Sequence, residues 1–225
     1  MNEFRATIKR CELRACCGRP FLRIEKLLSW LRAHAGDLLE ITYQQEGSDP
    51  ELPITKEELC SKNSALLVFS ILLELGRGEY VNIFDRKGLT DRLPIDMRTL
   101  EYELGDSEIP KTTVESLCAG FNEIQWRYCS PRFEFRRRRE YLANHVVPIL
   151  RKEAINTKGG TAKVWQIQVL EEFIEPDLRT VIQSSKFRGA STDPSDTLGW
   201  VKLLALLLDT CTHYQTELQF CFESV

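Results

Sequence analysis

The sequence lacks the residue patterns that build metal centres. It has three histidines and eight cysteines among 225 residues, yet no two cysteines are spaced as C-x-x-C. His34, His145 and His213 do not flank the cysteines at the short spacings of zinc sites. We therefore expect no metal site, and no histidine is placed to activate the Cys16-Cys17 pair as a nucleophile. The cysteines are interpreted as free thiols, several of them buried, in a reducing compartment.

Long apolar runs and a basic charge excess are also missing. The longest apolar run, near Leu203 to Leu208, is too short to span a bilayer, and the charged N-terminal segment has no apolar core of a signal peptide. The net charge of −3 argues against nucleic acid as the main ligand. We expect an intracellular protein, cytoplasmic or nuclear, that does not bind membranes.

The first half of the chain has the periodicity of a mainly α-helical domain. Thr55 and Glu58 form a capping box, and an apolar segment follows that predicts one buried helix from Thr55 to Leu75, ended by Gly76. A helix from Pro20 to about Ala35 and another from Thr112, in a second capping box with Glu115, are also predicted. Residues 1–19 are expected to be loose or to form a short helical start, and Asp37 to cap a short continuation of the Pro20 helix through Ile41. Residues 96–110 are expected to be mostly a surface loop.

A basic segment follows the helical half. Arg136 to Arg139 are four consecutive arginines, and Arg132 lies close by. Such a run suits phosphate or nucleic-acid binding, or a solvated linker. Glu134 and Glu140 flank the run and no series of aromatic residues accompanies it, so the linker interpretation is favoured.

The segment from Ile155 to Val169 predicts a strand, a glycine turn and a second strand. Apolar residues alternate in Lys163 to Val169, and Gly159-Gly160 precedes them. Glycines between two strands let backbone N–H groups approach a phosphate, as in the G-x-G-x-x-G-x-V loop of kinases. Aligned on Val164, the glycine positions hold Thr157, Gly159 and Ala162, so a simple β-hairpin with a Gly-Gly turn remains an alternative.

Four ordered segments resemble the N-terminal part of fungal protein-kinase-like proteins, in which a helical region precedes a kinase domain. The segments are Leu66 to Gly78, Leu93 to Ile95, Phe121 to Phe133, and Val147 to Ile149 running into Ile155 to Val169. The resemblance covers about residues 55–185. It implies an α+β protein with a helical regulatory or interaction domain over 1–133, a basic linker over 134–150 and an incomplete, β-containing kinase N-lobe-like segment over 151–225.

The resemblance also implies roles for single residues. Gly159 and Gly160 would cover nucleotide phosphates, in a loop with Lys158, Thr161 and Ala162, and Val164 would pack on the adenine base. The next strand should carry a lysine that pairs with the phosphates. Tyr214 to Gln219 is interpreted as that strand, with Gln219 at the lysine position, whereas Lys186 and Lys202 are predicted to lie outside a strand and Trp200 to Leu208 to form a short helix.

Motifs for phosphoryl transfer are missing from these 225 residues, which contain neither H-R-D nor D-F-G. We therefore expect no catalytic residues and no kinase activity from this chain alone. The first hypothesis is a helical module that contacts a protein partner or a kinase domain. The alternatives are a weak ATP-binding pseudokinase-like protein, with ATP as its ligand, and a helical nucleic-acid-binding module.

Overall fold

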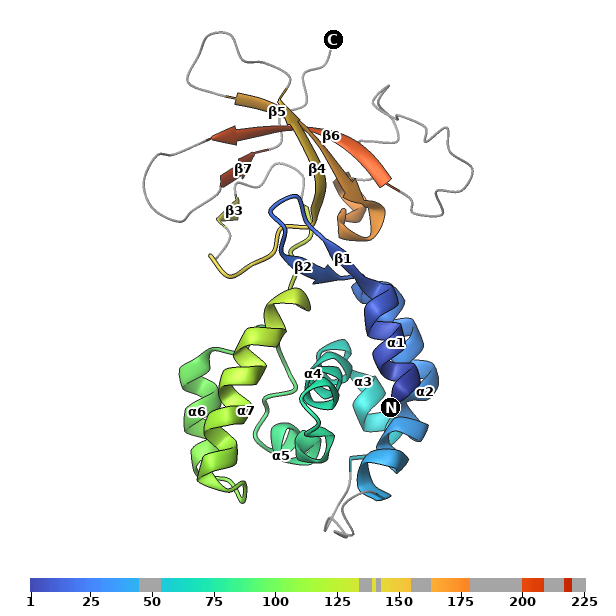
Figure 1. Cartoon of the computed structure of the whole chain (residues 1–225), viewed down its shortest axis with the longest axis vertical. Helices are drawn as coiled ribbons and strands as arrows, with labels where there is room; N and C mark the ends of the chain where they lie inside the picture. The colour runs from blue at the N-terminus through green and yellow to red at the C-terminus, as the bar shows by residue number, and fades with distance from the viewer. Residues whose placement is uncertain are drawn as a thin grey trace. The chain divides into compact units, whose positions relative to one another are not determined.

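The computed structural model describes residues 1–44, 54–133, 139–140, 143–154, 163–178, 200–208 and 217–219, and in 139–140, 163–165, 200–208 and 217–219 it describes the backbone only (Figure 1). The described part is a mixture of helices and antiparallel strands, so the α+β prediction is confirmed. The chain divides into two compact units. The first is Met1–Glu12 with Leu22–Cys129, and the second is Leu13–Phe21 with Ser130–Val225.

This division differs from the sequence prediction in one respect. A single cut was expected after residue 133, with everything before it in the helical domain. The structure instead assigns Leu13–Phe21 to the second unit, far along the chain from the rest of that unit. The segment is only nine residues long and has no clear hydrophobic period, so its own sequence gives no sign of which core it joins.

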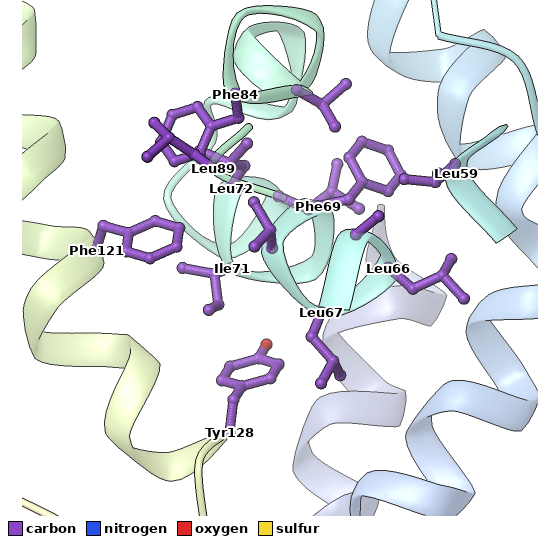
Figure 2. Close-up of a cluster of buried hydrophobic side chains, with 14 of the residues drawn as sticks. Leu59, Leu66, Leu67, Phe69, Ile71, Leu72, Phe84, Leu89, Phe121 and Tyr128 are labelled. Atoms are coloured by element: carbon purple, nitrogen blue, oxygen red, sulfur yellow. The ribbon is translucent and has the colours of Figure 1, made fainter. Parts of the chain in front are cut away.

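The first unit is helical. Its elements are α1 (Asn2–Cys11), α2 (Ile24–Gln44), α3 (Lys56–Ser61), α4 (Asn63–Glu74), η1 (Gly78–Tyr80), α5 (Val81–Arg86), α6 (Met97–Gly105), α7 (Lys111–Ile124) and η2 (Gln125–Arg127). Every residue from Ala65 to Leu73 in α4 is buried. A helix that is apolar on all sides has to be surrounded by other elements. Figure 2 shows Phe84, Phe121 and Tyr128 around the α4 side chains.

The predicted helix from Thr55 to Leu75 is two helices. The capping box is confirmed, since Thr55 Oγ1 accepts from the Glu58 N–H and Glu58 Oε2 accepts from the Thr55 N–H. Lys62 then adopts an extended conformation, with φ −127° and ψ 132°, and separates α3 from α4. The end of α4 is as predicted, because Gly76 has a φ of +67° and Arg77 N–H donates to Leu72 O.

Three other helix predictions were wrong. The predicted helix from Pro20 begins instead at Ile24 and runs to Gln44 as α2, because Pro20 lies in the strand β2 (Pro20–Leu22). The strand β1 (Glu12–Arg14) comes before it, and α1 is the short helical start that the sequence allowed. Residues 96–110 contain α6, whose first N–H groups donate to the Asp96 carboxylate. Helix α7 begins at Lys111 without a side-chain cap, which places Thr112 inside the helix. Pro110 precedes that first residue, and a proline next to the start is tolerated because its missing N–H has no helical partner there.

Gly78 lies where α2, α4 and η1 meet. A Cβ at this position would lie 2.7 Å from Leu73 Cδ2 and 3.0 Å from Thr42 Cγ2, and both of those residues are buried. We expect Gly78→Ala to lower the free energy of unfolding by about 2 kcal/mol through overpacking. Chemical denaturation followed by circular dichroism measures the change.

The matched control for this prediction is Gly105→Ala. Gly105 is exposed in the last turn of α6, and nothing lies within 4 Å of a Cβ built there. Alanine is a better helix former than glycine, so this variant should be neutral or slightly stabilised. Equal destabilisation of the two variants would contradict the packing argument.

The second unit contains a five-stranded antiparallel sheet. Its strands are β3 (Arg139–Glu140), β4 (Ile149–Ala154), β5 (Lys163–Leu170), β6 (Trp200–Leu208) and β7 (Glu217–Gln219), in the order β3-β7-β6-β5-β4. A 3-10 turn, η3 (Glu171–Phe173), follows β5. The predicted short helix at Trp200 to Leu208 is therefore wrong. An apolar run of this length suits a buried strand as well as a helix, and pairing with β5 along its length selects the strand.

The second unit has an apolar core of its own. Its buried members are Ala15, Phe21, Phe133, Val146, Ile149, Ile167, Val169, Leu170, Phe173, Ile174 and Leu178. Phe21, from β2, packs edge-on against Phe173 with ring centroids 5.5 Å apart. Phe133 N–H donates to Phe173 O, and Glu175 N–H donates to Phe133 O. The core thus joins three segments that are distant in sequence.

Candidate functional site

The glycine segment connects two paired strands, as the sequence predicts. Strands β4 and β5 are antiparallel, and the last pair before the connection is Ala154 with Trp165. Lys158, Gly159, Gly160, Thr161 and Ala162 fall in this connection and lie outside the described residues. Their assignment as phosphate-binding residues therefore stays a prediction.

The register of β5 assigns its residues to two faces of the sheet. Ile167 and Val169 are buried in the apolar core, whereas Gln166 and Gln168 are partly exposed. Alternate residues of a strand belong to the same face. The position of Val164 thus shares a face with Gln166 and Gln168, and this face meets the core only at Leu170, the last residue of the strand, which is buried.

Strand β6 places a lysine beside this hairpin. Lys202 was predicted to lie outside a strand, but it belongs to β6 and pairs with Gln168 of β5. Directly opposite residues of an antiparallel pair share a face. The positions of Val164, Gln168 and Lys202 therefore all belong to one face of the sheet.

The strand proposed from Tyr214 to Gln219 has a different neighbour. Only Glu217–Gln219 of that segment are described as a strand, β7, and they pair with β6 and β3. Gln219 lies opposite Leu206 of β6. The strand that follows β5 in the sheet is β6, and the lysine that it carries is Lys202. The sequence interpretation missed it because the apolar run around it was taken for a helix.

The structure describes little of the arginine run. Arg136, Arg137 and Arg138 lie outside the described residues, and Arg139 is described by its backbone in β3. Arg132 forms an ion pair with Glu175, with 4.0 Å between Nη1 and Oε1. Nothing in the described part assembles these arginines into one surface, so the nucleic-acid hypothesis gains no support.

A polar network inside the helical unit was not predicted from the sequence. Glu74, at the end of α4, accepts from Arg127 Nη2 through Oε2 and from the Tyr128 hydroxyl through Oε1. Arg127 Nη1 also donates to Glu12 Oε2 at 2.7 Å. Ser70 Oγ lies 2.9 Å from the Tyr128 hydroxyl, and because that hydroxyl donates to Glu74, Ser70 is the donor of this bond.

The electrostatics of the network suit a structural role. Burial raises the pKa of Tyr128 well above its usual value, and the neighbouring Glu74 carboxylate raises it further. Burial acts to lower the pKa of Arg127, but the charge of Glu74, the neighbouring Tyr128 and the hydrogen bonds to Glu12 and Glu74 together outweigh it, and the pKa is raised. Arg127 and Tyr128 therefore keep their protons at neutral pH, which makes them donors that hold Glu74 rather than proton-transfer groups.

Cys118, Cys129 and His34, which lies in α2, give no sign of chemistry. Burial raises the pKa of Cys118 to about 11 and that of Cys129 to about 12, so both remain thiols at neutral pH. His34 stacks on Trp30, with ring centroids 4.2 Å apart, and its Nδ1 lies 2.9 Å from Trp30 O. Within the described ranges no group of three or more His, Cys, Asp or Glu side chains could hold a metal ion.

Two further findings concern membrane-spanning helices and similarity to known proteins. In the part of the chain that the structure describes, no helix is both long and apolar enough to cross a bilayer. No protein-family model, no curated protein and no solved structure matches this chain.

Proposed function

We propose that this chain is a non-catalytic, protein-kinase-like protein that binds a nucleotide at the connection between β4 and β5. One observation carries the proposal. An antiparallel strand pair flanks the glycine segment, and the neighbouring strand β6 carries Lys202 at a position on the same face as Val164. Glycines in the connection would supply backbone donors for phosphate, and an apolar position and a lysine on one sheet face would supply a contact for the base and a cation.

The face with these positions suits a ligand for a further reason. The opposite face is occupied by the apolar core, in which Ile167 and Val169 are fully buried. Among the side chains that β5 presents on the proposed face, Gln166 and Gln168 are polar and partly exposed, whereas Leu170 at the end of the strand is buried. A nucleotide bound there would meet hydrogen-bonding groups without displacing the core.

Calorimetric titration with ATP, with and without Mg²⁺, tests the proposal. We expect the whole chain to bind ATP, and the Gly159→Asp, Gly160→Asp double variant to lose at least about tenfold in affinity, because two carboxylates would repel the phosphates. Lys202→Met should weaken binding as well. Gly105→Asp, in the helical unit, is the matched control for an added charge on a glycine and should bind as the unchanged chain does.

Two results would reject this function. One is the absence of binding up to millimolar ATP. The other is binding that the glycine variant retains in full, which would place the nucleotide elsewhere on the chain.

A second candidate, which we propose for the helical unit, is contact with a protein partner. Tyr102 on α6 is 74% exposed. Among the described residues it is the large hydrophobic side chain that is exposed to solvent. Tyrosine is enriched where proteins meet, since it offers apolar area and a hydroxyl on a stiff side chain. This candidate predicts that Tyr102→Glu abolishes binding to an identified partner, and Glu101→Gln, its exposed neighbour, does not.

A further inference from the structure

The turn between β1 and β2 presents two adjacent cysteines to solvent. Cys16 and Cys17 are both exposed free thiols. Gly18 N–H donates to Ala15 O at 2.8 Å, so the cysteines occupy the two central positions of a turn. Gly18 itself has a φ of +82°, a conformation that glycine adopts without strain. Adjacent residues of a strand project from opposite faces, but Cys16 and Cys17 lie in a turn, not in a strand.

This turn is held in place by hydrogen bonds to a distant part of the same unit. Cys16 N–H donates to Ile149 O, the first residue of β4, at 2.7 Å. Arg19 donates through its guanidinium group to the carbonyl oxygens of three consecutive residues, Ala143, Asn144 and His145. Arg14 Nη1 donates to Gly18 O at 2.9 Å. The backbone that carries the two thiols is therefore ordered before any ligand binds.

The charges around the thiols come from both neighbouring elements. Partial burial raises the pKa of Cys16, and the nearby Cys17 thiol raises it further, whereas Lys152 of β4 lowers it. Arg14 and Arg19 are the other charged groups of the turn, and their guanidinium groups are engaged with carbonyl oxygens. Both protons have to leave when the sulfurs bind a metal or metalloid.

The number of ligands decides which kind of ion fits. Structural zinc takes four protein ligands, and no described group of three or more potential ligands exists to complete such a set. Two thiolates satisfy a soft centre of low coordination number, for which sulfur is the preferred donor. A trivalent arsenical with one organic group needs two sulfur atoms and no other protein ligand.

We propose that the Cys16-Cys17 turn is a vicinal dithiol site that binds a trivalent arsenical or another soft centre through two sulfur atoms. With phenylarsine oxide, two S–H bonds and the arsenic–oxygen bonds break, and two As–S bonds form. The two protons leave with the oxide oxygen as one water molecule. Arsenic stays trivalent and the sulfurs are not oxidised, so no further reactant is needed.

The site also has a consequence for the sheet. The Cys16 N–H donates a hydrogen bond to the carbonyl oxygen of the first residue of β4, the strand that leads into the glycine segment. Phe21, which follows the turn, is fully buried in the core of the same unit. Bridging the two sulfurs removes conformational freedom from the turn. We expect the arsenical to slow amide hydrogen exchange in residues 13–21 and 149–154.

The test uses phenylarsine oxide, the full-length reduced chain and intact-mass spectrometry. We expect one adduct that resists competition by a monothiol. Affinity should fall at least about 100-fold in Cys16→Ser, in Cys17→Ser and in the double variant. At metal sites even the loss of a residue that only orients a ligand costs up to about that factor, and these variants lose a ligand itself. Serine at two exposed positions should leave the unfolding midpoint unchanged. Tryptic mapping of the unchanged chain should place the adduct on the peptide Ala15 to Arg23, independently of any variant.

The control variants separate this site from the other thiols. Cys211→Ser with Cys221→Ser, and Cys60→Ser with Cys129→Ser, should each keep the adduct. Loss of the adduct in either control, its persistence in the Cys16→Ser, Cys17→Ser double variant, or a requirement for only one of the two turn cysteines would overturn the proposal. Zinc binding as tight as that of the arsenical would also overturn it, since it requires ligands that the turn does not supply.

Discussion

Phe21→Ala is expected to lower the stability of the second unit by about 4 kcal/mol while the helical unit stays folded. Phenylalanine-to-alanine changes in a core remove buried area and leave a cavity, which typically costs this much. Phe21 is fully buried and packs on Phe173, although it precedes the rest of its unit by more than a hundred residues. Hydrogen exchange with peptide resolution should show faster exchange in β4 and β5 and unchanged exchange in α4.

Phe4→Ala is the matched control. Phe4 is equally buried, but it belongs to the core of the helical unit and contacts Trp30 with ring centroids 6.3 Å apart. This variant should accelerate exchange in α1 and α2 and spare β4 and β5. If Phe21→Ala disturbs the helical unit first, the assignment of Leu13–Phe21 to the second unit is wrong.

Arg127→Leu is expected to destabilise the helical unit by about 3 kcal/mol. The change leaves the Glu74 carboxylate, whose side chain is 14% exposed, without its cationic partner, and removing one partner of a buried ion pair costs about 3–5 kcal/mol. The lower end applies because Arg127 is 19% and Glu12 is 32% exposed, so water screens part of the charge. Chemical denaturation followed by circular dichroism measures the loss.

The control for Arg127 is an arginine with the same chemistry on the surface. Arg86 pairs with Glu108 at 3.5 Å, and their side chains are 61% and 80% exposed. Exposed ion pairs contribute little, so Arg86→Leu should change stability by less than about 0.5 kcal/mol. Similar effects of the two variants would mean that the network around Glu74 is no more important than a surface pair.

The double variant Arg127→Leu with Glu74→Leu refines this prediction. Replacing both partners by apolar residues removes the uncompensated charge together with the pair. We expect it to recover part of the stability lost in Arg127→Leu. Full recovery is not expected, because Tyr128 loses the acceptor of its hydroxyl as well.

The candidate site was predictable to the extent that it depends on local pattern. Alternation from Lys163 to Val169 identified β5, and the glycines before it identified the connection to another strand. Lys202 was missed for a physical reason. The residues around it are apolar without a period that distinguishes strand from helix, and only pairing with β5 makes them a strand. For the same reason the segment from Tyr214 to Gln219 was taken as the strand after β5, whereas its described part, β7, pairs with β6 and β3.

Cap and turn residues were predictable because their effect is local. Thr55 with Glu58 and Gly76 act on backbone groups within a few residues, so their roles followed from spacing. The break at Lys62 and the start of α7 before Thr112 could not be foreseen, since packing of neighbouring helices overrides weak local preferences.

The sequence by itself determined the mixed fold class, the burial of the helix before Gly76 and the strand after Gly160, because each depends on hydrophobic period and on residues with special backbone preferences. The tertiary structure alone decided that Phe21 joins the core of the second unit, that Arg127 and Tyr128 hold Glu74, and that Lys202 lies beside Gln168. These contacts join residues far apart in the chain, and no local pattern records which distant segments will bury their apolar surfaces together.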